Sequence, residues 1–222
     1  MTIKLPLENL PNTINIRGLS LDRKNKKLIF NSSIGSFKYG RIIRLLTRKV
    51  ELDGNIHCSY CGKVLKNNEI FYNRIYPREV GGIKIPQNML ITCSKCNKNK
   101  GNMTKFEYLE YINSNEKQKK VIKQKVKKSM EFYRKERAYK IPKTWIEYIN
   151  INTTELKTKL LKINNKKMLY EKEFYEKYEY FITPIIINTQ NYILNGVEKY
   201  KIAQKEKLDN IPVIIIENIK II

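Results

Sequence analysis

The chain has 222 residues, enough for one large domain or two small ones, and we take two as the working number. Its 44 lysines and arginines against 21 acidic residues give a formal charge of +23, which exceeds what solubility requires and predicts a polyanionic partner, above all nucleic acid. No run approaches the ~20 apolar residues of a membrane span, and residues 1–12 do not have the layout of a secretory signal. We therefore expect no membrane partner and a soluble intracellular protein, of the cytoplasm, the nucleoid or an organelle matrix. The abundance of Lys, Asn, Ile and Tyr suggests an AT-rich coding genome, such as that of a phage, a virus or an organelle.

The first 50 residues mix short apolar stretches with turn-forming residues. The apolar run at 28–30, for example, is followed by Asn-Ser-Ser at 31–33. This composition predicts strands and loops rather than long helices. The next region, 51–113, contains four cysteines, and its glycines and prolines predict hairpins and loops in a compact domain.

A helical region is expected to follow, because residues 105–138 contain neither proline nor glycine. Apolar residues recur there at steps of three and four, as in Phe106, Leu109 and Ile112, which predicts one long helix or two shorter ones ending before Pro142. A second helical stretch is expected from about 155 to 178. Residues 114–180 are thus assigned to a basic helical region.

The composition changes at Pro184. Apolar runs at 185–187, 192–194 and 212–216, with a helical pattern at 197–207, predict the order strand, strand, helix, strand. Residues 181–222 are therefore expected to form a small α/β module. Residues 183–222 carry five lysines against four acidic residues, so almost all of the net charge of +23 lies before them. The polyanion is accordingly expected on the earlier parts of the chain.

The four cysteines form two Cys-x-x-Cys pairs, Cys58 with Cys61 and Cys93 with Cys96. Each pair places two thiolates at a tight turn, and the 31 residues between the pairs let both turns meet around one tetrahedral zinc ion. The alternative is free or redox-active cysteines, which an intracellular setting does not favour over metal binding. A closed four-sulfur site would be structural, so catalysis would need a second metal.

The cysteines belong to a longer pattern of glycines, prolines and amides. It reads Cys58-x-x-Cys61-Gly62, Asn73-Arg74-Ile75-x-Pro77-Arg78-x-x-Gly81-Gly82, Asn88-Met89-Leu90 and Cys93-x-x-Cys96-Asn97-x-x-Lys100-Gly101. Over about residues 57–113 this resembles the zinc-containing HNH (ββα-metal) endonucleases. The resemblance implies a hairpin and a helix that hold a divalent ion, Mg²⁺ or Mn²⁺, against the scissile phosphate while a histidine activates water.

The resemblance places the catalytic site at Asn73, Arg74, Asn88 and Asn97. The usual Asp-His pair of the family falls on Asn73 and Arg74. A guanidinium cannot act as a general base near pH 7, although it can hold a phosphate or stabilise a transition state. Asn73 and Asn97 also offer neutral oxygens to a metal.

A nuclease would need a base from elsewhere in the chain. His57, the only histidine, would serve if the fold brings it near Asn97, but its place beside the first cysteine also fits a plain supporting role. Glu79 is the other candidate. Two interpretations stay open: an HNH-type endonuclease with metal-dependent cleavage of DNA, and a catalytically inactive HNH-like zinc protein that binds DNA or RNA as a scaffold, for example in a ribonucleoprotein.

Eleven lysines and arginines lie between Lys117 and Lys140, against two glutamates. Such a run is either a solvated helix surface or a contact to phosphates, and its density favours phosphates. The residues predicted to bind nucleic acid, with DNA favoured and RNA open, are Lys117, Lys119, Lys120, Lys123, Lys125, Lys127, Lys128, Arg134 and Arg137.

The last segment resembles the ParB/sulfiredoxin-like domain over residues 184–214. The resemblance implies that a glycine at a helix start and a basic residue after it hold the phosphates of a nucleotide, which places the contacts at Gly196 and Lys199. The alternative is a stable α/β packing unit used for self-association or contact with another protein. The expected fold class is α+β: a small zinc-bound ββα (HNH-like) domain with basic helices, joined to a small α/β ParB-like module.

Overall fold

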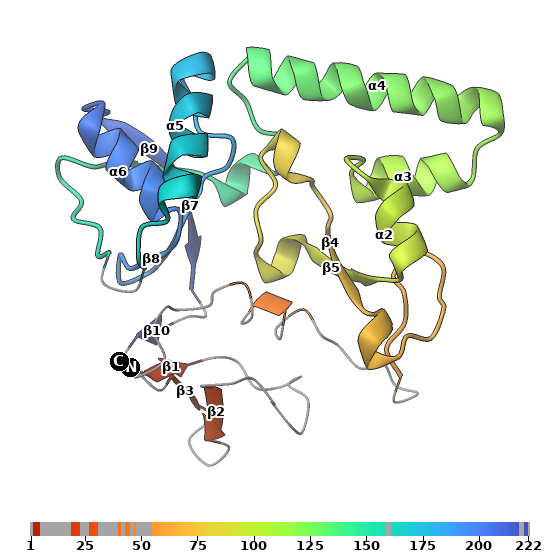
Figure 1. Cartoon of the computed structure of the whole chain (residues 1–222), viewed down its shortest axis with the longest axis horizontal. Helices are drawn as coiled ribbons and strands as arrows, with labels where there is room; N and C mark the ends of the chain where they lie inside the picture. The colour runs from red at the N-terminus through yellow and green to blue at the C-terminus, as the bar shows by residue number, and fades with distance from the viewer. Residues whose placement is uncertain are drawn as a thin grey trace. The chain divides into compact units, whose positions relative to one another are not determined.

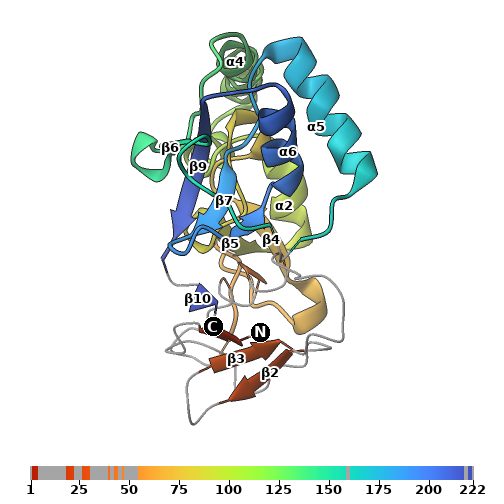
Figure 2. The same ribbon diagram turned by 90° about the vertical axis from the view of Figure 1, so that its left-hand side faces the viewer.

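The computed structural model describes residues 2–4, 19–22, 27–30, 40, 43, 44, 47, 55–158, 161–217 and 220–221. The chain forms two compact units, whose elements are labelled in Figures 1 and 2. Gly40–Pro142 and Tyr178–Thr183 make up one, which we call the cysteine unit. Met1–Tyr39, Lys143–Lys177 and Pro184–Ile222 make up the other, which we call the sheet unit. Together they have a mixed α+β composition.

A two-stranded hairpin leads into a helix in the cysteine unit. Strand β4 (Phe71–Arg74) pairs antiparallel with β5 (Met89–Thr92), and α2 (Ser94–Lys100) begins directly after β5. The short 3-10 helix η1 (Asn67–Glu69) precedes β4. The helices η2 (Arg78–Val80) and η3 (Pro86–Asn88) shape the connection between the two strands. This is the hairpin-then-helix order that the sequence predicts.

Buried polar contacts fix the connection between β4 and β5. The side chain of Asn88, which is 0% exposed, accepts a hydrogen bond from the Tyr76 amide and donates to the carbonyls of Tyr76 and Ile83. Gly82 packs so closely that a Cβ there would lie 1.7 Å from the Tyr76 carbonyl oxygen. A side chain at position 82 would therefore force this turn open.

Two further helices complete the cysteine unit, one of the two outcomes predicted for residues 105–138. Helix α3 (Lys105–Ile112) starts with a capping box of Thr104 and Glu107, and α4 (Glu116–Lys135) starts with one at Asn115. Figure 1 shows α4 running along α3. Buried Ile122 and Val126 of α4 join a core that also contains Ile56, Leu65, Ile91, Met103, Tyr108 and three of the cysteines.

The segment Tyr178–Thr183 returns from the later sequence to the cysteine unit. The Tyr139 hydroxyl donates to the Phe181 carbonyl, and Arg137 pairs with Glu179. Lys140, in the stretch after α4, pairs with Glu107 of α3 and donates to Ser129. The unit is thus closed by a segment that no sequence pattern connects to it.

The sheet unit contains a four-stranded mixed sheet in the order β6-β9-β7-β8. Strands β7 (Ile185–Asn188), β8 (Ile193–Asn195) and β9 (Asn210–Ile216), with α6 (Val197–Lys205), have the predicted order, and β7 and β9 run parallel. The edge strand β6 (Glu147–Asn150), antiparallel to β9, was not predicted. Figure 2 shows α6 beside α5 (Asn165–Tyr178). The short 3-10 helix η4 (Lys143–Trp145) precedes β6.

The helix expected from residue 155 is shorter than predicted. Helix α5 begins only at Asn165, and Lys157, which was expected to be helical, instead forms a β-bridge with Tyr192. Asn164 then caps the helix by accepting from the Lys167 amide at 3.0 Å.

A second sheet of the same unit joins the two ends of the chain. Strands β1 (Thr2–Lys4), β2 (Leu19–Asp22), β3 (Lys27–Phe30) and β10 (Lys220–Ile221) pair antiparallel in the order β10-β1-β3-β2. Strands are therefore present in the first 50 residues, as expected. Gly40, Ile43, Arg44 and Thr47 are described in helical conformation, and the rest of that region lies outside the described residues. Within the described part of the chain, no helix combines the length and apolarity needed to cross a bilayer.

Candidate functional site

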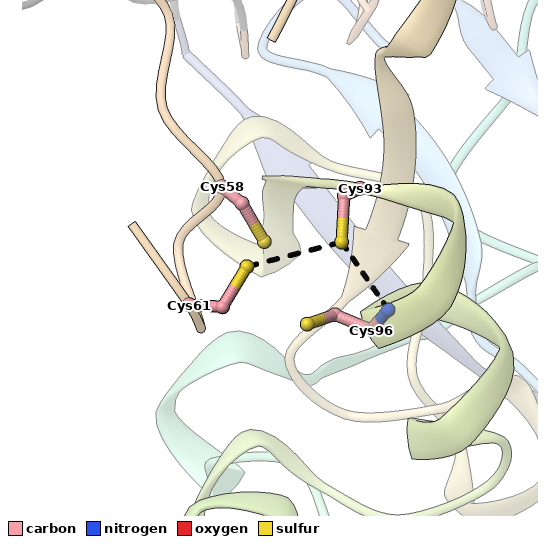
Figure 3. Close-up of side chains that lie close together, drawn as sticks. All are labelled: Cys58, Cys61, Cys93 and Cys96. Atoms are coloured by element: carbon pink, nitrogen blue, oxygen red, sulfur yellow. Dashed lines mark hydrogen bonds between the residues drawn. The ribbon is translucent and has the colours of Figure 1, made fainter. Parts of the chain in front are cut away.

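The four cysteine sulfurs converge in the cysteine unit, with all four Sγ atoms within 4.8 Å of one another (Figure 3). Cys58 and Cys61 lie on a turn in which the Gly62 amide donates to the Cys58 carbonyl at 2.9 Å, with Gly62 in the left-handed region at a φ of 69°. Cys93 follows β5 and caps α2, where its sulfur accepts from the Cys96 amide at 3.4 Å. The end of the hairpin and the first turn of the helix thus supply half of the cluster.

This donor set fits a tetrahedral zinc ion. The Sγ atoms of Cys61 and Cys93 are 3.9 Å apart, close to the separation of roughly 3.8 Å expected for two sulfurs at about 2.3 Å from one zinc. Burial raises the pKa of Cys58, but the backbone amides of Cys93, Cys61 and Tyr60 outweigh it and lower that pKa to about 7. Burial, followed by hydrogen bonds to Cys93 and Cys61, raises the pKa of Cys96 to about 12, although the Tyr108 hydroxyl opposes the effect. Zinc would neutralise these mutually repelling thiolates and replace their protons.

His57 lies on the cysteine turn. Its Nδ1 atom is 3.0 Å from the Gly62 carbonyl oxygen, and its backbone forms a β-bridge with Val64. It therefore supports the geometry of the turn that carries Cys58 and Cys61, the plainer of the two roles considered for it.

A pocket of about 310 Å³ opens between the hairpin and α2. Asn73 and Arg74 of β4 line it from one side and Asn97 of α2 from the other, so three of the four residues predicted as catalytic meet here. The side-chain amide of Asn73 donates a hydrogen bond to the side-chain oxygen Oδ1 of Asn97 at 2.6 Å. The fourth predicted residue, Asn88, does not line the pocket. Its side chain instead forms hydrogen bonds with the backbone of the connection between the strands.

The lining is strongly cationic. Among the described residues that form it, Glu79 is the only carboxylate, and five are basic: Arg44, Arg74, Arg78, Lys84 and Lys100. Burial, followed by repulsion from Arg78, lowers the pKa of Arg74, although Glu79 opposes the effect. The Arg74 Nε atom is buried without a hydrogen-bond partner in the described part of the chain. The pocket therefore concentrates positive charge around a guanidinium, that of Arg74, which still has a donor to offer.

Lys100 is the most unusual of these cations. It is 1% exposed, and burial lowers its pKa to about 8 despite the attraction of Glu107 and Glu79. Sequence reasoning did not single it out. A signal was nevertheless present, since Asn97 and Lys100 are three residues apart and so share one face of α2.

A divalent cation does not fit this lining. The two amides that would replace the carboxylate ligands are hydrogen-bonded to each other, and basic groups surround them. Within the described residues, the four cysteines form the only group of three or more His, Cys, Asp or Glu side chains arranged to hold a metal. We therefore derive no reaction step through Mg²⁺ or Mn²⁺ at this pocket.

Residues 58–103 match the model of the HNH endonuclease family. The match covers less than half of the chain and includes the cysteine cluster, the hairpin and α2. No curated protein and no solved structure matches the chain. An HNH domain indicates a function connected with nucleic acid, and the match does not extend to the segment that resembles the ParB/sulfiredoxin-like domain.

The basic residues after the HNH-matching region lie mostly on the surface of α4. Lys117, Lys120, Lys123, Lys125, Lys127 and Lys128 are exposed. Lys119 is partly covered and pairs with Glu116 at 2.8 Å. Arg134 is half-buried, and Arg137 pairs with Glu179. The exposed lysines are therefore available for phosphate contacts, whereas Arg137 already has an acidic partner.

The residues proposed for nucleotide binding lie in the sheet unit. Gly196 adopts the left-handed conformation at the start of α6, with a φ of 97°, and packs against Ile185 of β7. Lys199 is 3% exposed and its Nζ lies 4.0 Å from a carboxylate oxygen of Glu171. The lysine therefore faces a buried carboxylate of α5.

Proposed function

We propose that the protein binds nucleic acid through the phosphate backbone, using the pocket and α4 of the cysteine unit, and does not cleave it. The observation that carries this proposal is the composition of the pocket: five basic side chains and one carboxylate surround the position where an HNH enzyme would hold its divalent ion. Such a lining attracts phosphate and repels a metal cation.

The residue at the position of the general base supports binding over hydrolysis. Arg74 stays protonated near neutral pH even though burial lowers its pKa, so it cannot take a proton from water. Its guanidinium can instead donate two parallel hydrogen bonds to a phosphate. His57 is hydrogen-bonded within the cysteine turn and does not line the pocket.

The exposed lysines of α4 would extend the contact. Backbone contacts of this kind position a protein on a nucleic acid without reading its sequence. They also account for a large net charge on one unit, which speeds association and holds the protein on any polyanion of suitable shape. On this proposal the protein is a catalytically inactive HNH-like scaffold, whose ligand is DNA or RNA.

The second candidate function is metal-dependent cleavage, which the HNH match itself favours. The two are separated by incubating zinc-loaded protein with supercoiled plasmid in Mg²⁺ or Mn²⁺ and measuring nicking and binding on the same samples. We expect retention of the plasmid, no nicking, and weaker retention by Arg74→Ala. Nicking by the wild-type chain that disappears in Arg74→Ala would establish an endonuclease and overturn the proposal. The control is Lys205→Ala, which removes one exposed positive charge from α6.

A further inference from the structure

The buried lysine at the end of α2 has no role in the metal-dependent chemistry that the HNH match suggests. Lys100 lines the pocket together with Arg74, and only 1% of its surface is exposed to solvent. Placing an ammonium group there is unfavourable unless an anion compensates for it. Glu79 lines the same pocket and Glu107 lies nearby, but burial remains the largest influence on Lys100.

We propose that the pocket is a phosphate site that works without a divalent ion, in which Lys100 and Arg74 occupy the electrostatic role of the metal. This rests on the proposed nucleic-acid binding and adds the ligand group and the residue that it contacts. The ligand is a phosphodiester group of a nucleic-acid backbone, which binds through its two non-bridging oxygens. Its charge compensates the buried ammonium, and its oxygens accept from the Arg74 guanidinium, whose Nε otherwise has no partner within the described residues.

Two further observations agree with a preformed anion site. The hydrogen bond between Asn73 and Asn97 holds β4 and α2 together across the pocket, so the lining keeps its shape without a ligand. Lys84 also lines the pocket, and burial followed by repulsion from Arg44 and Arg74 lowers its pKa, which shows that the basic groups act on one another here. Basic side chains that repel one another in a buried pocket indicate a site arranged to bind an anion.

The test uses the zinc-loaded full chain and a fluorescent duplex of mixed sequence. Lys100→Met keeps most of the buried hydrocarbon and removes the charge, while Lys98→Met makes the same change at an exposed position of α2. We expect Lys100→Met to weaken binding about tenfold, the size of one lost charge-assisted hydrogen bond. Lys98→Met should change it less than about twofold. Mg²⁺ at matched ionic strength should not strengthen wild-type binding.

Thermal unfolding separates a ligand role from a structural one. If Lys100 serves to bind phosphate, Lys100→Met should raise Tm by about 5 °C, because an uncompensated buried charge disappears. If the lysine instead stabilises the fold through Glu79 and Glu107, the same variant should lower Tm. A lower Tm, equal binding by Lys100→Met and Lys98→Met, or a requirement for Mg²⁺ would each overturn the inference.

A second measurement decides the matter if Lys100→Met fails to fold. Inorganic phosphate should raise the Tm of the wild-type chain more than chloride at equal ionic strength, and should do so less in Arg74→Met. Equal effects of the two salts would refute the site. Failure of the wild-type chain to bind the duplex at all would instead overturn the proposed function.

Discussion

The amide pair of Asn73 and Asn97 shows how carboxamides in place of carboxylates can change which ligand a pocket binds. Carboxylates at these positions would repel each other and attract a cation. Two carboxamides can hydrogen-bond directly, as they do at 2.6 Å, and they leave the surrounding basic groups unneutralised. The character of the site is therefore set as much by the missing negative charges as by the arginine and lysines around them.

Removing one member of this pair should destabilise the cysteine unit. Asn97→Ala leaves the side chain of Asn73, which is 8% exposed, without its partner, and we expect a loss of about 1–3 kcal/mol in the free energy of unfolding. Denaturant titration measures this loss. Asn99→Ala on the exposed side of α2 is the matched control, and an equal effect in both variants would show that the amide pair contributes nothing.

Duplex binding should weaken as the pH rises from 7 to 9. The Lys100 pKa is about 8, so the ammonium is charged below this pH and loses its proton above it, while a phosphodiester does not titrate in this range. The contribution of Lys100 to phosphate attraction is therefore present at pH 7 and mostly lost by pH 9. The other charged groups in or near the pocket are Glu79, Glu107, Arg44, Arg74 and Arg78; burial also lowers the pKa of Lys84, which shifts binding in the same direction.

Fluorescence anisotropy across this pH window gives the measurement. Lys100→Met should flatten most of the profile, because the group that titrates is gone. A profile that is as steep in Lys100→Met as in the wild-type chain would assign the pH dependence to another group.

At the scale of elements, α4 separates a packing face from a charged face. Ile122 and Val126 are buried, and Lys120 and Lys127 lie on the opposite side by helical spacing and are exposed. Replacing both lysines with glutamine should lower the magnitude of the slope of log K against log salt by about 1.8 on duplex DNA, at roughly 0.9 per phosphate contact. Lys201→Gln with Lys205→Gln on α6 is the control pair, and an unchanged slope in the α4 variant would exclude these contacts.

The sequence predicted the elements whose signals are local. The two Cys-x-x-Cys pairs, the two helices around Phe106 and Ile122, and the strand-strand-helix-strand order after Pro184 all follow from spacing and periodicity. The late start of α5 and the edge strand β6 were missed, since both depend on pairing with distant strands, at Tyr192 and along β9. The backbone partners of Asn88 could not be predicted for a similar reason, because only the folded connection reveals them. The burial of Lys100 was missed, although its spacing of three residues from Asn97 placed both on one face of a helix.

At the scale of the whole molecule, the chain passes repeatedly between the two units. It leaves the sheet unit after Tyr39, returns after Pro142, contributes Tyr178–Thr183 to the cysteine unit, and returns again at Pro184. Neither unit is a continuous piece of sequence. The sequence-based division at residues 50, 113 and 180 therefore does not correspond to these compact units.

Zinc removal should unfold the cysteine unit and abolish nucleic-acid binding, because the cluster joins the turn at Cys58, the end of β5 and the start of α2. Scanning calorimetry with and without a zinc chelator tests this, together with duplex binding. We expect the chelator to remove one thermal transition and to leave one that reports the sheet unit. Retained duplex binding after complete zinc loss would contradict the prediction.

The path of the chain also sets an order of assembly during synthesis on the ribosome. All four cysteines of the cluster have been made once residue 96 has been added, whereas Phe181, whose carbonyl accepts from Tyr139, comes much later. Translation proceeds at about 5–20 residues per second, so the nascent chain can bind its metal seconds before the segment that closes the unit exists. Zinc limitation would therefore act on this protein during its synthesis, before the last part of the sheet unit has been translated.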